Sequence, residues 1–216
     1  MSQPTLTVNE IFYSIQGEAS HAGLPCIFVR LTACDLRCRW CDTEYAFHQG
    51  SPMTVSDIVT RIRKFGCLLV EVTGGEPLLQ PQVTVLVQTL LDDGFDVLVE
   101  TGGHRDVTVL DRRARIVMDL KCPGSGESDR NRWENLRHLD SRDMVKFVLA
   151  HHEDYRWACD VLREHQLVQR CPVFFSPVYG ELEPAELAGW MLEDGVAARL
   201  QVQLHKVLWD ADRRGV

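Results

Sequence analysis

The sequence lacks the features of a membrane protein or a nucleic-acid-binding protein. None of its apolar runs approaches the roughly 20 residues that a membrane-spanning helix needs, and the opening MSQPTLTVNE has no basic stretch followed by an apolar core. The net charge is -8, and no run of Lys and Arg is long enough to follow a phosphate backbone. These absences predict a cytoplasmic protein with no membrane contact and no direct nucleic-acid partner.

Internal repeats, low-complexity segments and obvious linkers are also missing. The chain has 216 residues, of which 45% are hydrophobic, and this is enough to bury one sizeable core. Two small domains are the alternative, but no boundary between them is visible in the sequence. We therefore expect a single domain over residues 1–216.

Short apolar runs recur along the chain, with amphipathic stretches between them. Seven runs predict buried strands: residues 26–32, 68–73, 96–101, 115–121, 144–150, 173–177 and 200–206. Between the first two, Thr54 and Asp57 resemble a capping box before a helical stripe of apolar residues that stops at Gly66. A second stripe ends at Gly94, and weaker helix patterns cover residues 130–140, 153–166 and 184–194.

This alternation of strands and helices predicts a parallel sheet with crossover helices. Such a sheet is either doubly wound or curled into a barrel, and six or seven mostly parallel strands favour an α/β fold of the incomplete (β/α) barrel type. In both architectures ligands bind at the carboxyl ends of the strands. We expect the polar residues at these ends to face one mouth: residues 30–34, 73–76, 100–103, 119–121, Ser176 and residues 203–206.

Three of the eight cysteines are close together in the sequence. Cys34, Cys38 and Cys41 form a C-x3-C-x2-C motif directly after the first predicted strand, with Trp40 just before the last cysteine. Without a secretion signal, such clustering indicates metal binding or catalysis rather than disulfides. The other five cysteines are scattered and are predicted to be buried small hydrophobic residues: Cys26, Cys67, Cys122, Cys159 and Cys171.

The spacing of the cysteine trio predicts an iron–sulfur cluster. A cubane of four irons and four sulfides needs one thiolate per iron, so three cysteines leave one iron open. An open iron can chelate the amino and carboxylate groups of S-adenosylmethionine, and a reduced cluster can then cleave it to a 5'-deoxyadenosyl radical. A zinc site completed by His48 or Cys67 is the alternative, but structural zinc usually shows two paired clusters and the sequence has no second pair.

The motif Thr73-Gly74-Gly75-Glu76-Pro77 lies between a predicted strand and a predicted helix. Taken alone, it is typical of an ordinary strand-to-helix turn. Beside the cysteine trio it favours a ligand site, because two glycines let a ligand approach the backbone and Glu76 can accept from an ammonium group. These groups suit a bound amino acid such as methionine.

The cysteine motif, followed by GGEP, resembles the radical S-adenosylmethionine superfamily, whose members use a full or partial (β/α) barrel. Further motifs resemble one family within it, the 7-carboxy-7-deazaguanine synthases: IFYSIQGEA (11–19), CRWCDT (38–43), VTGGEP (72–77), VETGG (99–103) and QLHK (203–206). The resemblance covers nearly the whole chain, with its motifs in the order and spacing of that family.

The resemblance implies a radical ring contraction in queuosine and 7-deazapurine biosynthesis. In this reaction 6-carboxy-5,6,7,8-tetrahydropterin becomes 7-carboxy-7-deazaguanine with loss of ammonia, and S-adenosylmethionine is regenerated in each turnover. The resemblance also implies a requirement for Mg2+, a homodimer, and an electron donor such as flavodoxin or ferredoxin.

The resemblance further implies a role for each matching position. Cys34, Cys38 and Cys41 would bind the 4Fe-4S cluster, and Thr43 would bind Mg2+. The residues around S-adenosylmethionine would be Trp40, Cys41, Asp42, Gly74, Gly75, Glu76, Asp119, Leu120, Lys121, Ser176, Pro177, Val178 and Tyr179. The residues around the pterin would be Ile15, Gln16, Gly17, Arg30, Thr73 and His205.

The chemistry of these side chains suits their implied roles. Mg2+ prefers oxygen ligands and keeps waters and substrate oxygens in its shell, so one threonine hydroxyl is a reasonable protein ligand. Arg30 can hold the pterin carboxylate through two parallel hydrogen bonds, although a surface arginine after a strand is the alternative. Gln16 offers a pterin edge both a donor and an acceptor. Glu18 and His205 could each bind substrate or merely satisfy a buried hydrogen bond.

The chain departs from the family pattern at three places. Asp119 and Leu120 stand where members carry a serine and a proline, and SPVYG (176–180) stands where others carry a glutamine–proline pair. The segment WDADRRGV (209–216) extends beyond the position at which some members end. We expect the ligand contacts to differ at these places.

Two other functions share parts of the pattern. A glycyl-radical activase has the same cysteine trio, but it consumes S-adenosylmethionine stoichiometrically and needs a protein partner. A non-catalytic zinc module would contain zinc and neither iron nor sulfide.

Overall fold

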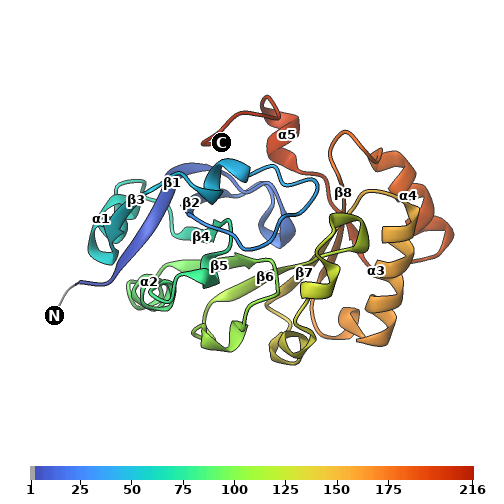
Figure 1. Ribbon diagram of the computed structural model, residues 1–216, viewed down its shortest axis with the longest axis horizontal. Helices are drawn as coiled ribbons and strands as arrows, with labels where there is room; N and C mark the ends of the chain where they lie inside the picture. Colours follow the sequence, from blue (N-terminus) through green and yellow to red (C-terminus); the bar gives the residue numbers. More distant parts are fainter. Residues whose placement is uncertain (1–2) are drawn as a thin grey trace.

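The computed structural model describes residues 3–216 and contains one nine-stranded sheet in the order β3-β1-β2-β4-β5-β6-β7-β8-β9. From β2 onward all neighbouring strands are parallel. These seven strands are β2 (Pro25–Leu31), β4 (Leu69–Gly74), β5 (Asp96–Thr101), β6 (Arg115–Leu120), β7 (Met144–Leu149), β8 (Val173–Pro177) and β9 (Arg199–Leu200). The two end strands, β3 and β9, do not pair with each other, so the predicted incomplete barrel is confirmed. Figure 1 shows the strands of this sheet from β3 to β8.

Two antiparallel strands were not predicted from the sequence. β1 (Thr5–Ile15) pairs with β2 on one side and with the short β3 (Ser51–Thr54) on the other. The pairing of β1 with β2 shifts register between Val8 and Glu10, so the alternation of buried and exposed residues is broken within the strand. An irregularity of this kind hides a strand from a period-two search.

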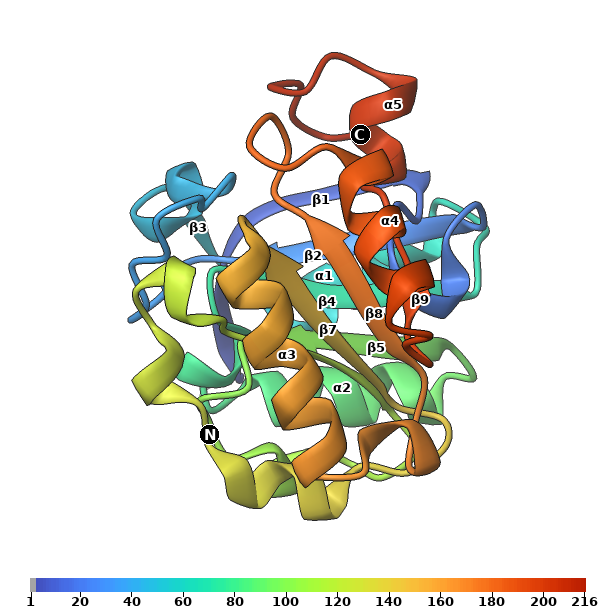
Figure 2. The ribbon, with the colours of Figure 1, turned by 90° about the vertical axis from the view of Figure 1, so that its right-hand side faces the viewer.

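Five α-helices accompany the sheet: α1 (Val55–Arg63), α2 (Val83–Asp92), α3 (His152–Glu164), α4 (Pro184–Glu193) and α5 (Leu204–Leu208). The predicted cap of α1 is confirmed, because the Asp57 amide donates to Thr54 Oγ1 at 3.1 Å. Figure 2 shows α3 and α4 lying across β7 and β8.

Two of the predicted elements differ from the structure. Instead of one helix over residues 130–140, the chain forms two short 3-10 helices, Ser128–Arg130 and Trp133–His138. The run 200–206 is not one strand, since β9 covers only Arg199–Leu200 and α5 begins at Leu204. No helix among residues 3–216 is long and apolar enough to cross a membrane.

The two faces of the sheet differ in polarity. The face toward the helices belongs to the main core, which includes Val72, Val99, Met118, Phe147 and Phe175. The opposite, inner face begins with a small apolar cluster of Ala19, Leu98, Val117, Met144 and Phe174. Two positions further along four of these strands, and therefore on the same face, the residues are polar: Glu100, Asp119, Lys146 and Ser176. The inner face thus turns polar toward the carboxyl ends of the strands.

Candidate active site

The cysteine trio lies in the loop that follows β2. Cys34, Cys38 and Cys41 are each partly buried and form no disulfide. The Leu36 amide donates to the Cys34 sulfur at 3.4 Å. Burial raises the pKa of each thiol, while the nearby Lys121 ammonium acts in the opposite direction. A backbone donor and a nearby cation suit thiolates, which is the state that binds iron.

One candidate for the fourth ligand of the zinc alternative lies away from the cysteine trio. Cys67, a proposed fourth ligand, bonds the Pro25 carbonyl at 3.3 Å, at the start of β2, whereas the trio follows the end of that strand. Within residues 3–216, no three His, Cys, Asp or Glu side chains converge as ligands of a single metal ion. The ligands of one zinc must converge in this way, whereas the thiolates of a cubane bind different irons.

Contacts to neighbouring strand ends fix the cysteine loop. The Asp35 carboxylate contacts His104 Nε2 at 2.6 Å and Arg105 Nη2 at 2.5 Å, just after β5. The Arg37 amide donates to Glu127 at 2.6 Å and the Arg39 amide donates to the Ser125 carbonyl at 3.0 Å, in the segment after β6. The loop is therefore held between the ends of two inner strands.

The glycine turn packs against the residues just before the first cysteine. The Gly75 amide donates to the Leu31 carbonyl at 3.1 Å, and the Glu76 amide donates to the Ala33 carbonyl at 2.8 Å. A Cβ atom on Gly75 would lie 2.6 Å from the carbonyl carbon of Ala33 and 2.8 Å from Cys34 Cβ. Gly74 has a φ of +156°. The turn therefore needs its glycines for close contact between two backbones, and not only for a possible ligand.

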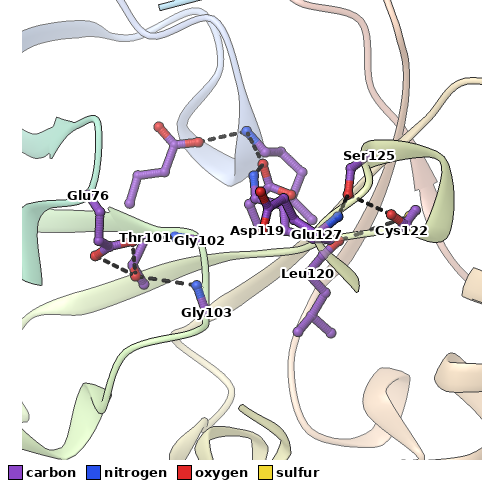
Figure 3. Close-up of polar contacts among 12 residues, drawn as sticks. Glu76, Thr101, Gly102, Gly103, Asp119, Leu120, Cys122, Ser125 and Glu127 are labelled. Atoms are coloured by element: carbon purple, nitrogen blue, oxygen red, sulfur yellow. Dashed lines mark hydrogen bonds and ion pairs between the residues drawn. The ribbon is translucent and has the colours of Figure 1, made fainter. Parts of the chain in front are cut away.

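Glu76 points into the protein, away from solvent. Its carboxylate accepts from Thr101 Oγ1 at 2.9 Å and from the Gly102 amide at 2.9 Å (Figure 3). It also accepts from the Leu78 amide at 3.0 Å. The residue is fully buried, and burial raises the pKa of its carboxyl group. The Glu76 oxygens are thus hydrogen-bonded within the fold, and contact of this carboxylate with an ammonium group stays a prediction. The backbone of the turn remains the part that a ligand can approach.

Asp119 offers an unsatisfied acceptor at the end of β6. Its Oδ2 accepts from Lys121 Nζ at 2.9 Å, whereas its Oδ1 is buried and has no hydrogen-bond partner among the described residues. A buried oxygen without a donor is rare in proteins and fits a ligand hydroxyl or ammonium group. The neighbouring Leu120 side chain is fully buried in the main core, so only its backbone can contact a ligand.

The segment after β1 meets the carboxyl-terminal segment at the mouth. Gln16, which follows Ile15 at the end of β1, is buried and its Nε2 donates to Glu71 Oε2 at 2.5 Å. The Leu204 amide donates to the Gly17 carbonyl at 3.0 Å, and the His205 ring lies close against Gly17. The structure therefore brings together substrate-site candidates that are nearly 190 residues apart in the sequence.

Glu71 is a buried acid beneath these residues. Burial and the nearby Glu100 carboxylate raise the pKa of Glu71 to about 8. Burial of the His205 ring lowers the pKa of that histidine. Both side chains therefore favour their neutral forms near neutral pH, where they can donate as well as accept hydrogen bonds.

Arg30 lies between an acid and an aromatic ring. Its Nε donates to Glu10 Oε1 at 2.8 Å, and the Tyr45 hydroxyl donates to the same oxygen at 2.9 Å. The guanidinium is mostly buried, with 17% of the side chain exposed, so it is not an ordinary surface arginine. The ion pair uses Nε and leaves the two Nη groups for a carboxylate ligand.

Beyond the trio, Asp42 and Thr43 lie near the carboxyl-terminal segment. Lys206 Nζ is 2.9 Å from Asp42 Oδ2, and Thr43 Oγ1 donates to Asp42 Oδ1 at 3.0 Å. The Lys206 ammonium, with the Thr43 hydroxyl, holds the pKa of Asp42 well below its usual range. The Trp40 ring is partly buried, with the Arg39 guanidinium 5.1 Å from its centroid.

The predicted cofactor segment at the end of β8 is divided between interior and surface. Ser176, Pro177 and Val178 are buried, whereas 58% of Tyr179 is exposed. Lys206 Nζ lies 5.2 Å from the centre of the Tyr179 ring. The carboxyl-terminal segment then returns to the loop after β2 (Figure 1), where Arg214 lies 3.8 Å from the centre of the Tyr45 ring.

Sequence reasoning missed Lys146 as a candidate site residue, and it placed Glu100 at a strand end without giving it a role. Thr73 Oγ1 donates to Glu100 Oε2 at 3.1 Å, and Lys146 Nζ lies 2.6 Å from Glu100 Oε1. A signal was present, because both are charged residues at alternate positions of otherwise apolar strands, VLVET and MVKFV. Charged residues in buried strands point to an inner face that binds something.

Comparisons with known proteins agree with this site. The model of the radical SAM superfamily matches residues 29–123, which contain the cysteine trio and the glycine turn. The 7-carboxy-7-deazaguanine synthase of Chlorobaculum tepidum is 44% identical over 218 aligned residues, which cover 100% of this chain and 99% of the relative. This chain belongs to the 7-carboxy-7-deazaguanine synthase family.

One further comparison agrees with membership of the synthase family, and another shows a similar fold. The synthase of Koribacter versatilis is 41% identical over 98% of this chain and 100% of that protein. The crystal structure of QueE from Escherichia coli is similar in fold, with a TM-score of 0.76 at 21% identity, and the match covers 93% of this chain and 95% of that one. The radical SAM superfamily implies a 4Fe-4S cluster and S-adenosylmethionine. The three free cysteines and the unpartnered Asp119 oxygen fit these groups.

Proposed function

We propose that this chain converts 6-carboxy-5,6,7,8-tetrahydropterin to 7-carboxy-7-deazaguanine with loss of ammonia, a step in making queuosine and other 7-deazapurines. The observation that carries the proposal is the 44% identity to a 7-carboxy-7-deazaguanine synthase along the entire chain. The polar inner face supports it, because a pterin carries both donors and acceptors that such a face can match.

When bound, the cluster and S-adenosylmethionine supply the radical that starts the reaction. The task of the protein is to hold these groups and the pterin in register and to exclude water. We propose that Cys34, Cys38 and Cys41 hold the cluster and that the backbone of Gly74 and Gly75 binds the amino-acid end of S-adenosylmethionine. The remaining cofactor contacts would come from Trp40, Asp42, Asp119, Lys121, the backbone of Leu120, and residues 176–179.

The pterin would lie against the inner face between β1, β2 and β4. In this arrangement Arg30 holds the pterin carboxylate with its Nη groups, because a guanidinium can bind a carboxylate through two parallel hydrogen bonds. Residues 15–17, Thr73 and His205 would surround the ring. The neutral His205 and Glu71 side chains avoid placing further charge beside it.

Thr43 is proposed as the protein ligand of Mg2+. Its hydroxyl is a hard oxygen ligand next to the ionised Asp42, whose negative charge favours a cation nearby. Lys206 competes for the same carboxylate, so we expect binding of Mg2+ to shift the contact between Lys206 and Asp42. We also propose that the chain works as a homodimer and takes electrons from a flavodoxin or a ferredoxin.

The function is tested with anaerobically reconstituted protein supplied with the carboxypterin, S-adenosylmethionine, Mg2+ and a reductant. We expect a product with the ultraviolet spectrum of a 7-deazapurine, with little net loss of S-adenosylmethionine. Stoichiometric consumption of S-adenosylmethionine without product, and activity only with a protein partner, would instead identify a glycyl-radical activase. An intact cluster with no deazapurine formed would refute the proposal.

A further inference from the structure

A buried ammonium group lies at the centre of the polar inner face. Lys146 Nζ is 2.6 Å from Glu18 Oε2, 2.6 Å from Glu100 Oε1 and 3.8 Å from Asp119 Oδ2. Glu18 belongs to the segment after β1, Glu100 lies on β5 and Asp119 lies on β6. One cation on β7 therefore joins three separate parts of the chain.

The carboxylates of this cluster are more exposed than the ammonium. Only 6% of the Lys146 side chain is exposed, compared with 16% for Glu18 and 26% for Glu100. Each ionised carboxylate has about four lone-pair positions. Glu100 also accepts from Thr73, one of the substrate-site candidates, and Glu18 accepts from the Gln203 side chain at 2.9 Å. Both acids therefore have a fixed orientation and keep room for a donor from a ligand.

We propose that Lys146 is a positioning residue that holds Glu18 and Glu100 as ionised acceptors for the N–H groups of the pterin. This inference rests on the proposed function, which supplies the class of ligand. A pterin, oxidised or reduced, presents its ring N3–H and 2-amino group as donors along one edge, and a carboxylate is an acceptor on all its lone pairs only while it is ionised. The three residues would thus select a ligand edge that is rich in donors.

The charges of the cluster agree with this role. Burial opposes the charged form of Glu100, yet the Lys146 ammonium leaves the pKa of Glu100 below its ordinary value. Burial also opposes the charge on Lys146, but Glu100 and Glu18 raise the pKa of Lys146 well above its ordinary value. Without the ammonium, two carboxylates would share one poorly hydrated space and one would take up a proton. That acid would then present a donor to the donors of the ligand.

The direct test is Lys146→Met in the reconstituted holoenzyme, with 6-carboxypterin as a fluorescent, unreactive probe. Loss of charge-assisted bonds predicts a Kd for the probe that is about tenfold to a hundredfold higher. Affinity for S-adenosylmethionine should stay within about twofold, because Asp119 keeps its 2.9 Å contact with Lys121. Lys64→Met, at the exposed end of α1, is the matched control and should change neither affinity.

A second variant separates positioning from a purely structural role. Lys146→Met combined with Glu100→Gln removes one of the two carboxylates that lose their cation, while Glu18 keeps its hydrogen bonds from Gln201 and Gln203. Buried ion pairs can often be replaced by neutral groups without loss of stability. We expect this double variant to unfold at nearly the wild-type urea concentration and still to bind the probe weakly. Wild-type affinity in either variant would overturn the inference. If the wild-type enzyme itself fails to bind the probe, the fault lies instead with the proposed function.

Discussion

The substitution Gly75→Ala tests whether the glycine turn and the cysteine loop are built as one unit. The added Cβ would lie 2.6 Å from the carbonyl carbon of Ala33 and 2.8 Å from Cys34 Cβ. Ordinary contacts between carbon atoms are about 3.5 to 4.0 Å, so one backbone must retreat by about 1 Å. Neither neighbour is the flexible end of a long side chain, and the strain cannot be relieved by a rotamer change.

The cost can be worked out from the contacts that must give way. Overpacking costs about 1 to 3 kcal/mol. The two backbone hydrogen bonds across this contact, from the Gly75 and Glu76 amides, contribute about 1 kcal/mol each when lost. We therefore expect the free energy of unfolding to fall by about 3 to 5 kcal/mol, a large part of the roughly 5 to 15 kcal/mol typical of a protein. Because the displaced atoms include Cys34, the iron content should fall as well.

Urea unfolding followed by circular dichroism, and iron analysis after anaerobic reconstitution, measure these two effects. Gly189→Ala is the matched control, because Gly189 lies within α4 and its added Cβ would meet no atom within 4 Å. Alanine is the better helix former, so this control should gain up to about 1 kcal/mol. Equal stability and equal iron content in Gly75→Ala and the wild type would refute the reasoning.

Three further predictions concern the site. The folded state holds the Glu71 proton up to a pH of about 8 and the unfolded state loses it near 4.5, so the stability that depends on this proton declines as the pH rises between these values. Glu71→Gln should remove a part of that decline, amounting to at most about 5 kcal/mol. The measurement is the free energy of unfolding in urea at several pH values, and the same pH dependence in the variant and the wild type would contradict the buried acid. Cys38→Ala should lose most of its iron, whereas Cys67→Ala should retain it, and equal iron in both would refute the ligand assignment. Thr43→Ala should need a higher Mg2+ concentration for half-maximal activity while its affinity for S-adenosylmethionine is unchanged, and an unaltered Mg2+ response would argue against the hydroxyl ligand.

The parallel strands were predictable from the sequence because they are buried on the helix side and bounded by clear turns. The strand run predicted at 200–206 fails for a physical reason. Apolar and polar residues do alternate in this run, but the polar ones face inward. Leu200 and Val202 are 41% and 40% exposed, whereas Gln201 is buried. The Gln201 side chain donates to Glu18 at 3.1 Å, so a polar partner across the mouth decides which residues face inward. No periodicity rule includes a partner that is so distant in sequence.

The site was predictable where a motif carries its own chemistry. The cysteine spacing and the glycine turn identify two neighbouring loops, and the structure places them in contact through the Ala33 carbonyl. The inner charges were not predictable in the same way. The role of Lys146 depends on its contacts with Glu18 and Glu100, which lie 128 and 46 residues away in the sequence.

The closing of the mouth by distant segments has a consequence for synthesis of the protein. Glu18 and its partners Gln201 and Gln203 are separated by 183 and 185 positions. At the usual ribosomal rate of about 5 to 20 residues per second, roughly 10 to 40 s pass between their appearances. From the translation of Cys41 onward, the growing chain carries the three cysteines, while Gln201 and Gln203 have yet to be translated.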